Sequence, residues 1–455
     1  MWGRTATELA AGIRAREFSA RELMSAYLER IEAVNPRVNA IVTLVAPETA
    51  LALADAADRA ELRGALHGLP IAVKDVEDTA GMRTTYGSPL FAEHVPEADS
   101  LLVERLRAAG ALVIGKTNTP EFAAGSQTFN GVFGATRNPW DLARTPGGSS
   151  GGAAAAVAAG MLPFADGSDL GASVRNPAAF CGLVGLRPSP GVVPDAGRSD
   201  PWNPLPVLGP IARTVDDAAL LLSALAGPDP RDPLSVGPAF VPELPDVPTG
   251  LRVAWSRDLG GLPVEPEVTA ALDRGRATLE ALGCVVEEAE PSFEGADESF
   301  EVLRGVTFAG TFKDILHEVK PALAENVRFG LSLQPERIAR ALELRGALFA
   351  RMRELLTRYD LLAAPVTQVA PFSVEEEYPR SVAGVEMGSY LEWFRSCSRI
   401  TVTTHPAVAV PAGFTDGGLP IGLQLVGRHR GERGLLAFAR AFCDATGLAE
   451  RRPPL

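Results

Sequence analysis

Two serines and a lysine lie in three short segments whose residue types suit the transfer of an acyl group from nitrogen. The segments are GLPIAVKD at residues 68–75, which ends just after Lys74, PGGSSGG at residues 146–152, which contains Ser149, and GSDLGASVR at residues 167–175, which contains Ser173. A serine hydroxyl is a poor nucleophile until a neighbouring base removes its proton. Lys74 can be that base, because burial at the end of an apolar strand lowers the pKa of its amine. The second serine then relays the proton. Each segment alone is more often a linker, a solvated lysine or a turn, so the interpretation depends on their joint occurrence.

The turn before Ser173 is rich in small residues and offers closely spaced backbone N–H groups. These groups belong to Leu170, Gly171, Ala172 and Ser173. Such donors can converge on the oxyanion that develops during acyl transfer, where each is typically worth about 3–4 kcal/mol. Asp169 and Arg175 flank the turn, and we predict that they form an ion pair that fixes it. Two independent surface charges are the alternative.

The elements that must position these groups alternate between strands and helices. Short apolar runs at 71–73 and 112–114 predict buried strands, and the pattern at 101–109 predicts a helix between them. This order indicates an α/β fold with a largely buried sheet. The Ala- and Gly-rich run at 151–160 is too short to span a membrane and predicts a tightly packed central helix.

The composition is that of an ordinary globular protein and argues against several functions. Of 455 residues, 46% are hydrophobic and 22% are charged, and the net charge of −13 argues against nucleic acid as a partner. We find no apolar stretch of roughly 20 residues and no signal-peptide pattern, so we expect a cytoplasmic protein with no membrane partner. The cysteines are too widely spaced for a disulfide framework or a zinc site, and we expect no metal and no cofactor.

Taken together, the three segments resemble the amidase-signature family. The pattern of that family is a G-x-P-x-x-V-K-D strand, a G-G-S-S-G-G loop and a D-x-G-G-S-x-R turn. Ser149 and Ser173 stand 24 residues apart, as the bridging and nucleophilic serines of the family usually do. The similarity covers most of the chain and continues through residues 115–122, 137–141, 177–188, 359–365 and 411–424.

The resemblance implies a Ser-Ser-Lys triad. Ser173 would be the nucleophile, Ser149 the proton-relaying serine on a cis peptide, and Lys74 the general base and later the acid. The residues expected to support the triad are Ser150, Asp169 and Arg175. By position, the residues expected to line the acyl pocket are Gly125, Ser126 and Gln127.

The resemblance also implies one α/β domain over residues 1–455, with a mixed central sheet covered by helices on both faces. We expect the core of the triad at about 60–215 and the closing strands and helix at 356–455. The segment at about 225–355 is the least family-like, and we expect it to build the entrance for the substrate.

Two departures from the family pattern bear on the site. Ala172 replaces the usual second glycine of the turn, and its methyl group would be strained if this position required a positive φ. Residues 401–406, TVTTHP, stand where many members have an Asn-x-x-Gly-x-Pro stretch, so we expect a different pocket wall there. His405 is then either a substrate contact or, as the more common alternative, a packed or surface histidine.

Three other readings of the sequence compete with this one. Residues 110–117 fit the phosphate-binding pattern G-x-x-x-x-G-K-T, but the intervening residues form an apolar strand rather than a loop. Residues 148–152 fit the G-x-S-x-G elbow of α/β-hydrolases, with His405 or His429 to complete a triad, but no apolar strand leads into them. The third reading is the glutaminase subunit of a tRNA-dependent amidotransferase, which would use the same chemistry within a complex.

The sequence therefore predicts a free-standing amidase that acts on C–N bonds of linear amides other than peptides. Aryl or alkyl amides are the expected substrates, and carbamates (urethanes) present the same carbonyl to the same nucleophile. A small-molecule substrate is the expected partner, and a homodimer is left open.

Overall fold

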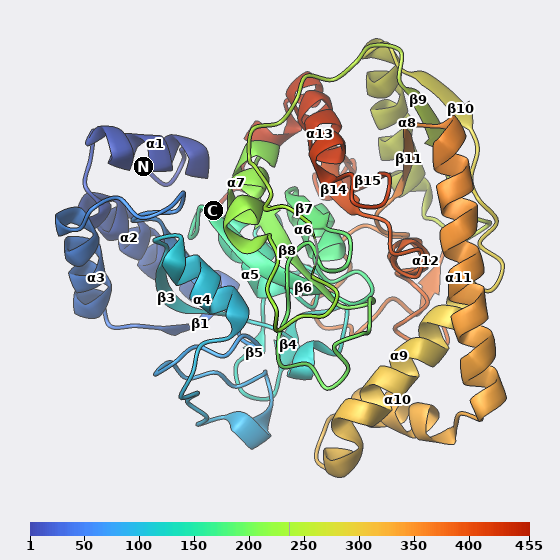
Figure 1. Ribbon diagram of the computed structural model, residues 1–455, viewed down its shortest axis with the longest axis horizontal. Coiled ribbons are helices and arrows are strands. Elements are labelled where there is room, and N and C mark those ends of the chain that lie inside the picture. Colours follow the sequence, from blue (N-terminus) through green and yellow to red (C-terminus); the bar gives the residue numbers. More distant parts are fainter. Residues whose placement is uncertain (236) are drawn as a thin grey trace.

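The protein is built around a mixed central sheet. The computed structural model describes residues 1–235 and 237–455, and within them eight strands form this sheet in the order β10-β9-β11-β15-β14-β7-β8-β6 (Figure 1). The strands are β6 (Phe164–Asp169), β7 (Val184–Arg187), β8 (Val207–Ala212), β9 (Arg252–Trp255), β10 (Val285–Glu288), β11 (Leu361–Pro365), β14 (Ala407–Phe414) and β15 (Pro420–Val426). Strands β10, β9 and β11 run parallel to one another, whereas the other neighbours are antiparallel.

Helices cover both faces of this sheet, which confirms the predicted α/β fold. On one face lie α5 (Gly151–Ala158) and α6 (Arg175–Cys181), and on the other lie α7 (Val215–Leu225), α8 (Pro266–Ala281) and α13 (Glu432–Thr446). Central strands that are covered on both sides read as continuous apolar runs, and every residue of β15 is buried accordingly. The Gly- and Ala-rich α5 is entirely buried, because its small side chains allow close packing.

The N-terminal part contains a second, smaller sheet. Its strands are β1 (Ile41–Leu44), β2 (Pro70–Lys74) and β3 (Leu112–Thr117), in the order β1-β3-β2. Strands β2 and β3 are parallel and are connected through α4 (Leu101–Ala108), as the sequence predicts. At the end of β2, the backbone N–H of Lys74 donates to the carboxylate of Asp166 on β6, at 3.1 and 3.3 Å. This side-chain contact brings the smaller sheet against the central one.

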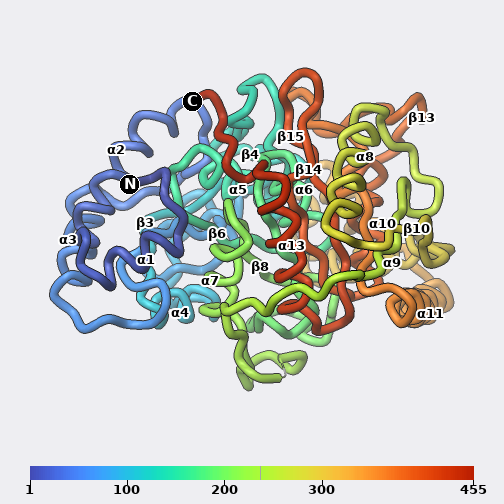
Figure 2. Tube along the Cα trace, turned by 90° about the horizontal axis from the view of Figure 1, so that it is seen from above, coloured from blue at the N-terminus to red at the C-terminus, as the bar shows by residue number. Residues whose placement is uncertain are grey.

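The remaining helices lie at the two ends of the molecule (Figures 1 and 2). The N-terminal end carries α1 (Ala6–Ala15), α2 (Ala20–Val38) and α3 (Pro47–Arg59), and the opposite end carries α9 (Ala296–Phe312), α10 (Pro321–Ser332), α11 (Pro335–Arg358) and α12 (Arg395–Thr401). The short elements are the hairpins β4 (Phe129–Asn130) with β5 (Gly134–Ala135) and β12 (Ser381–Val382) with β13 (Val385–Glu386), and the 3₁₀ turns Pro89–Phe91, Glu121–Ala123, Lys313–Ile315 and Leu448–Glu450.

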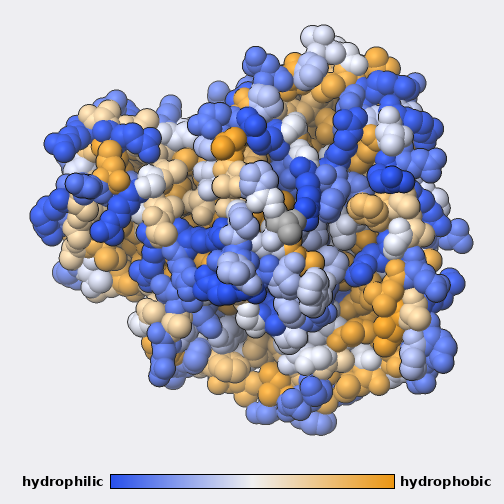
Figure 3. Space-filling view, in the orientation of Figure 1, coloured by the Kyte–Doolittle hydropathy of each residue, from blue (hydrophilic) through white to orange (hydrophobic). Residues whose placement is uncertain are grey.

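The surface in the view of Figure 1 is mostly polar, with apolar side chains gathered over the region of α9 (Figure 3). Among the residues that the structure describes, we find no helix with both the length and the apolar character needed to cross a membrane.

Candidate active site

The amine of Lys74 lies at the end of β2, fully buried, and contacts three hydroxyl groups. Its Nζ donates to Ser149 Oγ at 2.7 Å, to Ser150 Oγ at 2.9 Å and to Ser168 Oγ at 2.9 Å. Each of the three protons of a lysine ammonium therefore has an acceptor. The structure thus brings Lys74 and the predicted bridging serine into direct contact, and it adds Ser168, which the sequence analysis missed.

The environment of Lys74 favours the loss of one of these protons. Burial lowers the pKa of Lys74 from 10.5 to about 8, and the nearby carboxylates of Asp166 and Glu77 oppose this shift only in part. The shift corresponds to about 3 kcal/mol between the charged and the neutral form of the amine. Burial also raises the pKa of Asp166, to about 6, so that this carboxylate becomes neutral, and stops supporting the lysine charge, only below about that pH. A general base needs a pKa close to the working pH, and Lys74 meets this condition.

The loop that carries Ser149 and Ser150 leads directly into α5. The peptide bond between Gly148 and Ser149 is cis, as the resemblance to the family implies. Gly148 is required by its surroundings, because a Cβ atom there would lie 2.8 Å from the backbone nitrogen of Gln127.

The turn between β6 and α6 lines a cavity. Among the residues that the structure describes, none of the N–H groups of Leu170, Gly171, Ala172 and Ser173 donates a hydrogen bond to the protein. Partly buried amides rarely stay unpaired in folded proteins, so four in succession mark a place for an acceptor from outside the chain. Ala172 is not among the residues with positive φ, so its methyl group imposes no backbone strain.

A buried ion pair holds this turn in place. Arg175 binds the carboxylate of Asp169 through Nε at 3.0 Å and Nη2 at 3.1 Å, and Nη2 also donates to the carbonyl of Gly171 at 2.9 Å. The predicted ion pair is therefore present, with both side chains fully buried. Burial alone would raise the pKa of Asp169. The charges of Arg175 and Arg187 outweigh this effect and lower the pKa from 3.8 to about 2. The carboxylate stays charged at neutral pH.

The divergent segment at 401–406 acts on the same turn. The hydroxyl of Thr401 donates to the carbonyl of Gly171 at 3.1 Å and accepts from Arg175 Nη2 at 2.7 Å. His405 does not line the cavity; it is buried against Phe349, with ring centroids 5.1 Å apart. Burial lowers the pKa of His405 to about 4. His405 is therefore a packed histidine, and Thr401 is the residue of the divergent segment that contacts the turn.

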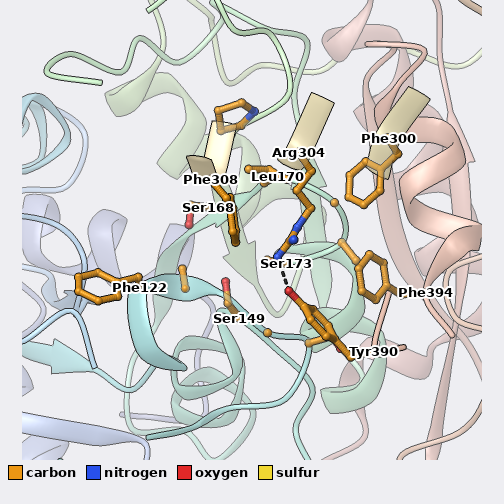
Figure 4. Close-up of a pocket in the computed structure, with 16 residues that line it drawn as sticks. Phe122, Ser149, Ser168, Leu170, Ser173, Phe300, Arg304, Phe308, Tyr390 and Phe394 are labelled. Atoms are coloured by element: carbon orange, nitrogen blue, oxygen red, sulfur yellow. Dashed lines mark hydrogen bonds between the residues drawn. The ribbon is translucent and has the colours of Figure 1, made fainter. Parts of the chain in front are cut away.

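Ser173 and Ser149 line the same cavity, but among the described residues their hydroxyl groups are not hydrogen-bonded to each other. Figure 4 shows both side chains together with Ser168 at the cavity. The main chains are joined directly, since the N–H of Ser150 donates to the carbonyl of Ser173 at 3.2 Å. Over residues 1–235 and 237–455, however, no hydrogen bond joins the Ser173 and Ser149 hydroxyls. Of the two hydrogen bonds in the predicted proton relay, the described residues form the one between Lys74 and Ser149.

The cavity has a volume of about 190 Å³ and largely aromatic walls. Among the described residues, its aromatic lining consists of Phe122, Phe300, Phe308, Tyr390 and Phe394, and Arg304 is the one charged side chain. Of the predicted pocket residues, Gly125 and Ser126 line this cavity, but Gln127 does not. The amide of Gln127 instead donates to the carbonyls of Val374 and Glu376, both at 2.7 Å.

The residues behind two of the competing readings have structural roles. Lys116, the lysine of the phosphate-binding pattern, lies in the buried strand β3. Its Nζ donates to the carbonyl of Glu77 and to Thr79 Oγ1. His405 and His429 lie next to each other, with ring centroids 6.0 Å apart, and neither lines the cavity that contains the serines.

Comparison with known proteins assigns the chain to a family. The Amidase family model matches residues 22–436, and the chain belongs to the amidase-signature family. The acylamidase of Rhodococcus erythropolis is 38% identical over 464 residues, covering 99% of this chain and 97% of that protein. A glutamyl-tRNA(Gln) amidotransferase subunit from Moorella thermoacetica is 39% identical over 486 residues, covering 99% of this chain and 98% of that protein.

Solved structures agree with this assignment. A bacterial aryl acylamidase of the amidase-signature family superimposes with a TM-score of 0.91 at 28% identity, covering 99% of both chains. The 6-aminohexanoate cyclic dimer hydrolase superimposes with a TM-score of 0.89 at 29% identity, covering 100% of this chain and 99% of that one. The chain is therefore an amidohydrolase of the amidase-signature family.

Proposed function

We propose that the protein is a free-standing amidase that cleaves aryl or short alkyl amides through a seryl acyl-enzyme. The observation that carries the proposal is the 2.7 Å hydrogen bond between Lys74 and Ser149, at a buried amine whose pKa is about 8. Ser149 of this pair lines the same cavity as Ser173 and its turn, whose amides have no acceptor among the described residues. These positions support the proposal that the cavity holds the relay, the nucleophile and the oxyanion site, with the base one hydrogen bond behind the relay.

In the proposed reaction, Ser173 Oγ attacks the carbonyl carbon of the amide. Its proton passes to Ser149 Oγ, while the proton of Ser149 passes to the neutral Nζ of Lys74. The free amides of the turn bind the negative oxygen of the tetrahedral intermediate. Lys74 then returns a proton through Ser149 to the leaving nitrogen, and water hydrolyses the ester by the same route in reverse. The step requires the Ser173 hydroxyl to turn towards Ser149, as catalytic hydrogen bonds often do only when substrate is bound.

The cavity limits the size of the group that it can hold. A cavity of about 150 Å³ accommodates benzene, so about 190 Å³ suits one aromatic ring or a short alkyl chain. The aromatic walls favour the same groups, because ring-to-ring contacts add to the burial of apolar area. Carbamates of this size fit equally well, since they present the same carbonyl to Ser173. The linear-amide specificity is part of this proposal.

The second candidate is the glutaminase subunit of an amidotransferase, the kind of complex for which the similar protein of Moorella thermoacetica is named. A glutamine substrate brings an α-ammonium group that needs a negative partner. Among the described residues that line the cavity, none is an aspartate or a glutamate. This absence and the aromatic walls favour a neutral or anionic aryl or alkyl amide over glutamine.

The test is to assay the isolated chain on nitroanilides, primary amides, carbamates and glutamine. We expect turnover of small aryl amides without any partner protein, and little release of ammonia from glutamine. Ser173→Ala should abolish turnover, and Lys74→Ala should lower kcat/KM by several orders of magnitude through loss of the base. Near-normal activity in either variant would refute the catalytic roles. Activity on glutamine alone, dependent on partner proteins, would favour the second candidate.

A further inference from the structure

Arg304 is a buried cation that faces the catalytic cavity. It lies on α9, is only 4% exposed, and projects into the cavity between Phe308 and Tyr390 (Figure 4). Its guanidinium carbon lies 3.9 Å from the centroid of the Phe308 ring. The reaction steps proposed above do not use this residue.

The protein orients Arg304 but does not neutralise it. Its Nη1 donates to Asn326 Oδ1 on α10, and its Nη2 donates to the hydroxyl of Tyr390. Both partners are uncharged at neutral pH, because burial raises the pKa of Tyr390. Within the described chain, no carboxylate lies within the 4.0 Å of an ion pair with Arg304. The guanidinium has five N–H groups, so several remain without an acceptor from the described residues.

Such an arrangement is costly unless a ligand completes it. A buried charge without a partner loses its hydration and gains no ion pair in return, which destabilises the folded protein. Burial lowers the pKa of Arg304, but an arginine does not lose its proton in a protein. The nearby Arg175 shows how the same fold treats a structural guanidinium, since that side chain is paired with Asp169. The unpaired Arg304 therefore points to an anion that enters the cavity.

We infer that Arg304 binds a carboxylate carried by the substrate, so that the preferred substrates are small amides with a second, anionic end. A carboxylate matches the planar fork of the guanidinium and can accept two parallel hydrogen bonds. Half-amides of short dicarboxylic acids and anilides with a ring carboxylate belong to this class. The inference rests on the proposed function, because it takes the cavity of Ser173 as the substrate site.

The test measures binding and turnover separately. Binding is measured by calorimetry in a Ser173→Ala background, using two matched pairs of ligands: N-(4-nitrophenyl)succinamate with N-(4-nitrophenyl)succinamide, and 4-acetamidobenzoate with 4-acetamidobenzamide. We expect at least one carboxylate to bind ten or more times as tightly as its neutral partner. Arg304→Gln should lower the affinity for that carboxylate by at least about 30-fold, because it removes one partner of a buried, hydrogen-bonded charge pair.

Three further variants show that the effect belongs to the guanidinium. Arg340→Gln is the matched control, since Arg340 is exposed on α11 and pairs with Glu298 at 3.0 Å; it should leave the preference intact. Arg304→Lys should keep part of the preference, because it retains the charge but not the fork. Tyr390→Phe removes one orienting group and should weaken the carboxylate complex even if Arg304→Gln fails to fold.

The outcomes separate the inference from the proposed function. Equal affinities within both pairs, or a preference that survives Arg304→Gln, would overturn the role of Arg304, even if the wild type turns over all the amides. A carboxylate preference that depends on Arg304 would support this role. Failure of the wild type to hydrolyse any of the four compounds would count against the proposed amidase, whatever the binding result.

Discussion

At the scale of single residues, Lys74 combines two requirements that oppose each other. As an ammonium it holds three hydroxyl groups at 2.7 to 2.9 Å, and this fixes Ser149, Ser150 and Ser168. As a base it must give up one of these protons and accept one from Ser149 instead. Complete burial favours the neutral form, whereas the carboxylates of Asp166 and Glu77 and the three hydrogen bonds favour the charged form. The balance places the pKa of Lys74 near 8, where both forms are available.

This balance predicts the pH dependence of the enzyme. Because only neutral Lys74 can accept a proton, kcat/KM should rise with pH through about 8 and level off above it. Below a pH of about 8, Lys74 is mostly protonated and cannot accept the proton of Ser149. The measurement is a pH profile of kcat/KM on a neutral aryl amide. A profile that is flat from pH 6 to 9, or that falls, would contradict a lysine base.

Ser168 provides a variant that should move this profile. Ser168→Ala removes one hydrogen bond to the ammonium form, so the pKa of Lys74 should fall and the rise should occur at lower pH. A Ser168→Ala enzyme with reduced activity but an unmoved profile would show that Ser168 contacts Lys74 without tuning it.

At the scale of elements, α9 forms one wall of the cavity and α10 holds it in place. Phe300, Arg304 and Phe308 recur at intervals of four residues, so they share one face of α9. On another side of the helix, Gly305 meets Gly330 of α10 so closely that a Cβ atom on Gly330 would lie 2.0 Å from the Gly305 carbonyl oxygen. The two glycines thus set the distance between these helices.

Gly330→Ala should therefore disturb the cavity from a distance. The added methyl group forces α10 away from α9 and shifts Asn326, which orients Arg304. We expect a loss of about 1–3 kcal/mol in unfolding free energy, as for other overpacked sites, together with a lower kcat/KM. Urea unfolding and steady-state kinetics measure the two effects.

The matched control is Gly310→Ala on α9, where a Cβ atom would meet nothing within 4 Å. Replacing an exposed helical glycine with alanine should stabilise the helix by roughly 0.5–1 kcal/mol. If Gly330→Ala behaved in the same way as Gly310→Ala, the close crossing of α9 and α10 would not be what positions the wall.

The sequence predicts best the elements that are marked by patterns of neighbouring residues. Strands β2 and β3 and helix α4 carry their own apolar and Gly/Pro patterns, and the sequence locates them correctly. The smaller sheet was not foreseen, because local patterns locate strands but do not tell which strands pair with one another, and β1, β3 and β2 pair only among themselves. Ser168 was missed although it lies two residues after Asp166 on β6, and alternate residues of a strand share a face.

The sequence analysis expected residues 225–355 to build the substrate entrance, but it did not predict the aromatic residues that line the cavity. Its walls come from residues near 122, 300–308 and 390–394, which no local pattern connects. The family motifs lie around the triad, whereas α9 belongs to the segment with the weakest resemblance. The sequence therefore predicts the reacting groups better than the groups that select the substrate.

At the scale of the whole molecule, the ion pair of Asp169 and Arg175 joins parts of the chain that are distant in sequence. Arg175 donates to the carbonyl of Cys397 at 3.0 Å and to Gln424 Oε1 at 2.6 Å, which links α6 to α12 and β15. Asp169 also accepts from Arg187 of β7 at 3.3 Å. One carboxylate thus balances two buried guanidinium groups at the centre of the fold.

Asp169→Asn should consequently destabilise the whole protein, because it keeps the shape but leaves Arg175 and Arg187 without a counter-charge. Removing one partner of a buried ion pair costs about 3–5 kcal/mol. The matched control is Asp216→Asn, since Asp216 is 48% exposed, pairs with Arg440 at 3.5 Å, and should contribute no more than about 1 kcal/mol. Urea unfolding at pH 7 measures both changes.

The pH dependence of this difference tests its electrostatic origin. The pKa of Asp169 is lowered from 3.8 to about 2, so its charged form stabilises the folded protein fully above pH 3.8. This contribution is lost as the pH falls through about 2, where folded Asp169 is also protonated. The gap between wild type and Asp169→Asn should therefore stay constant from pH 7 to about 5 and narrow below pH 4. A gap that persists unchanged in acid would mean that Asp169 stabilises the fold through its hydrogen bonds and shape and not through its charge.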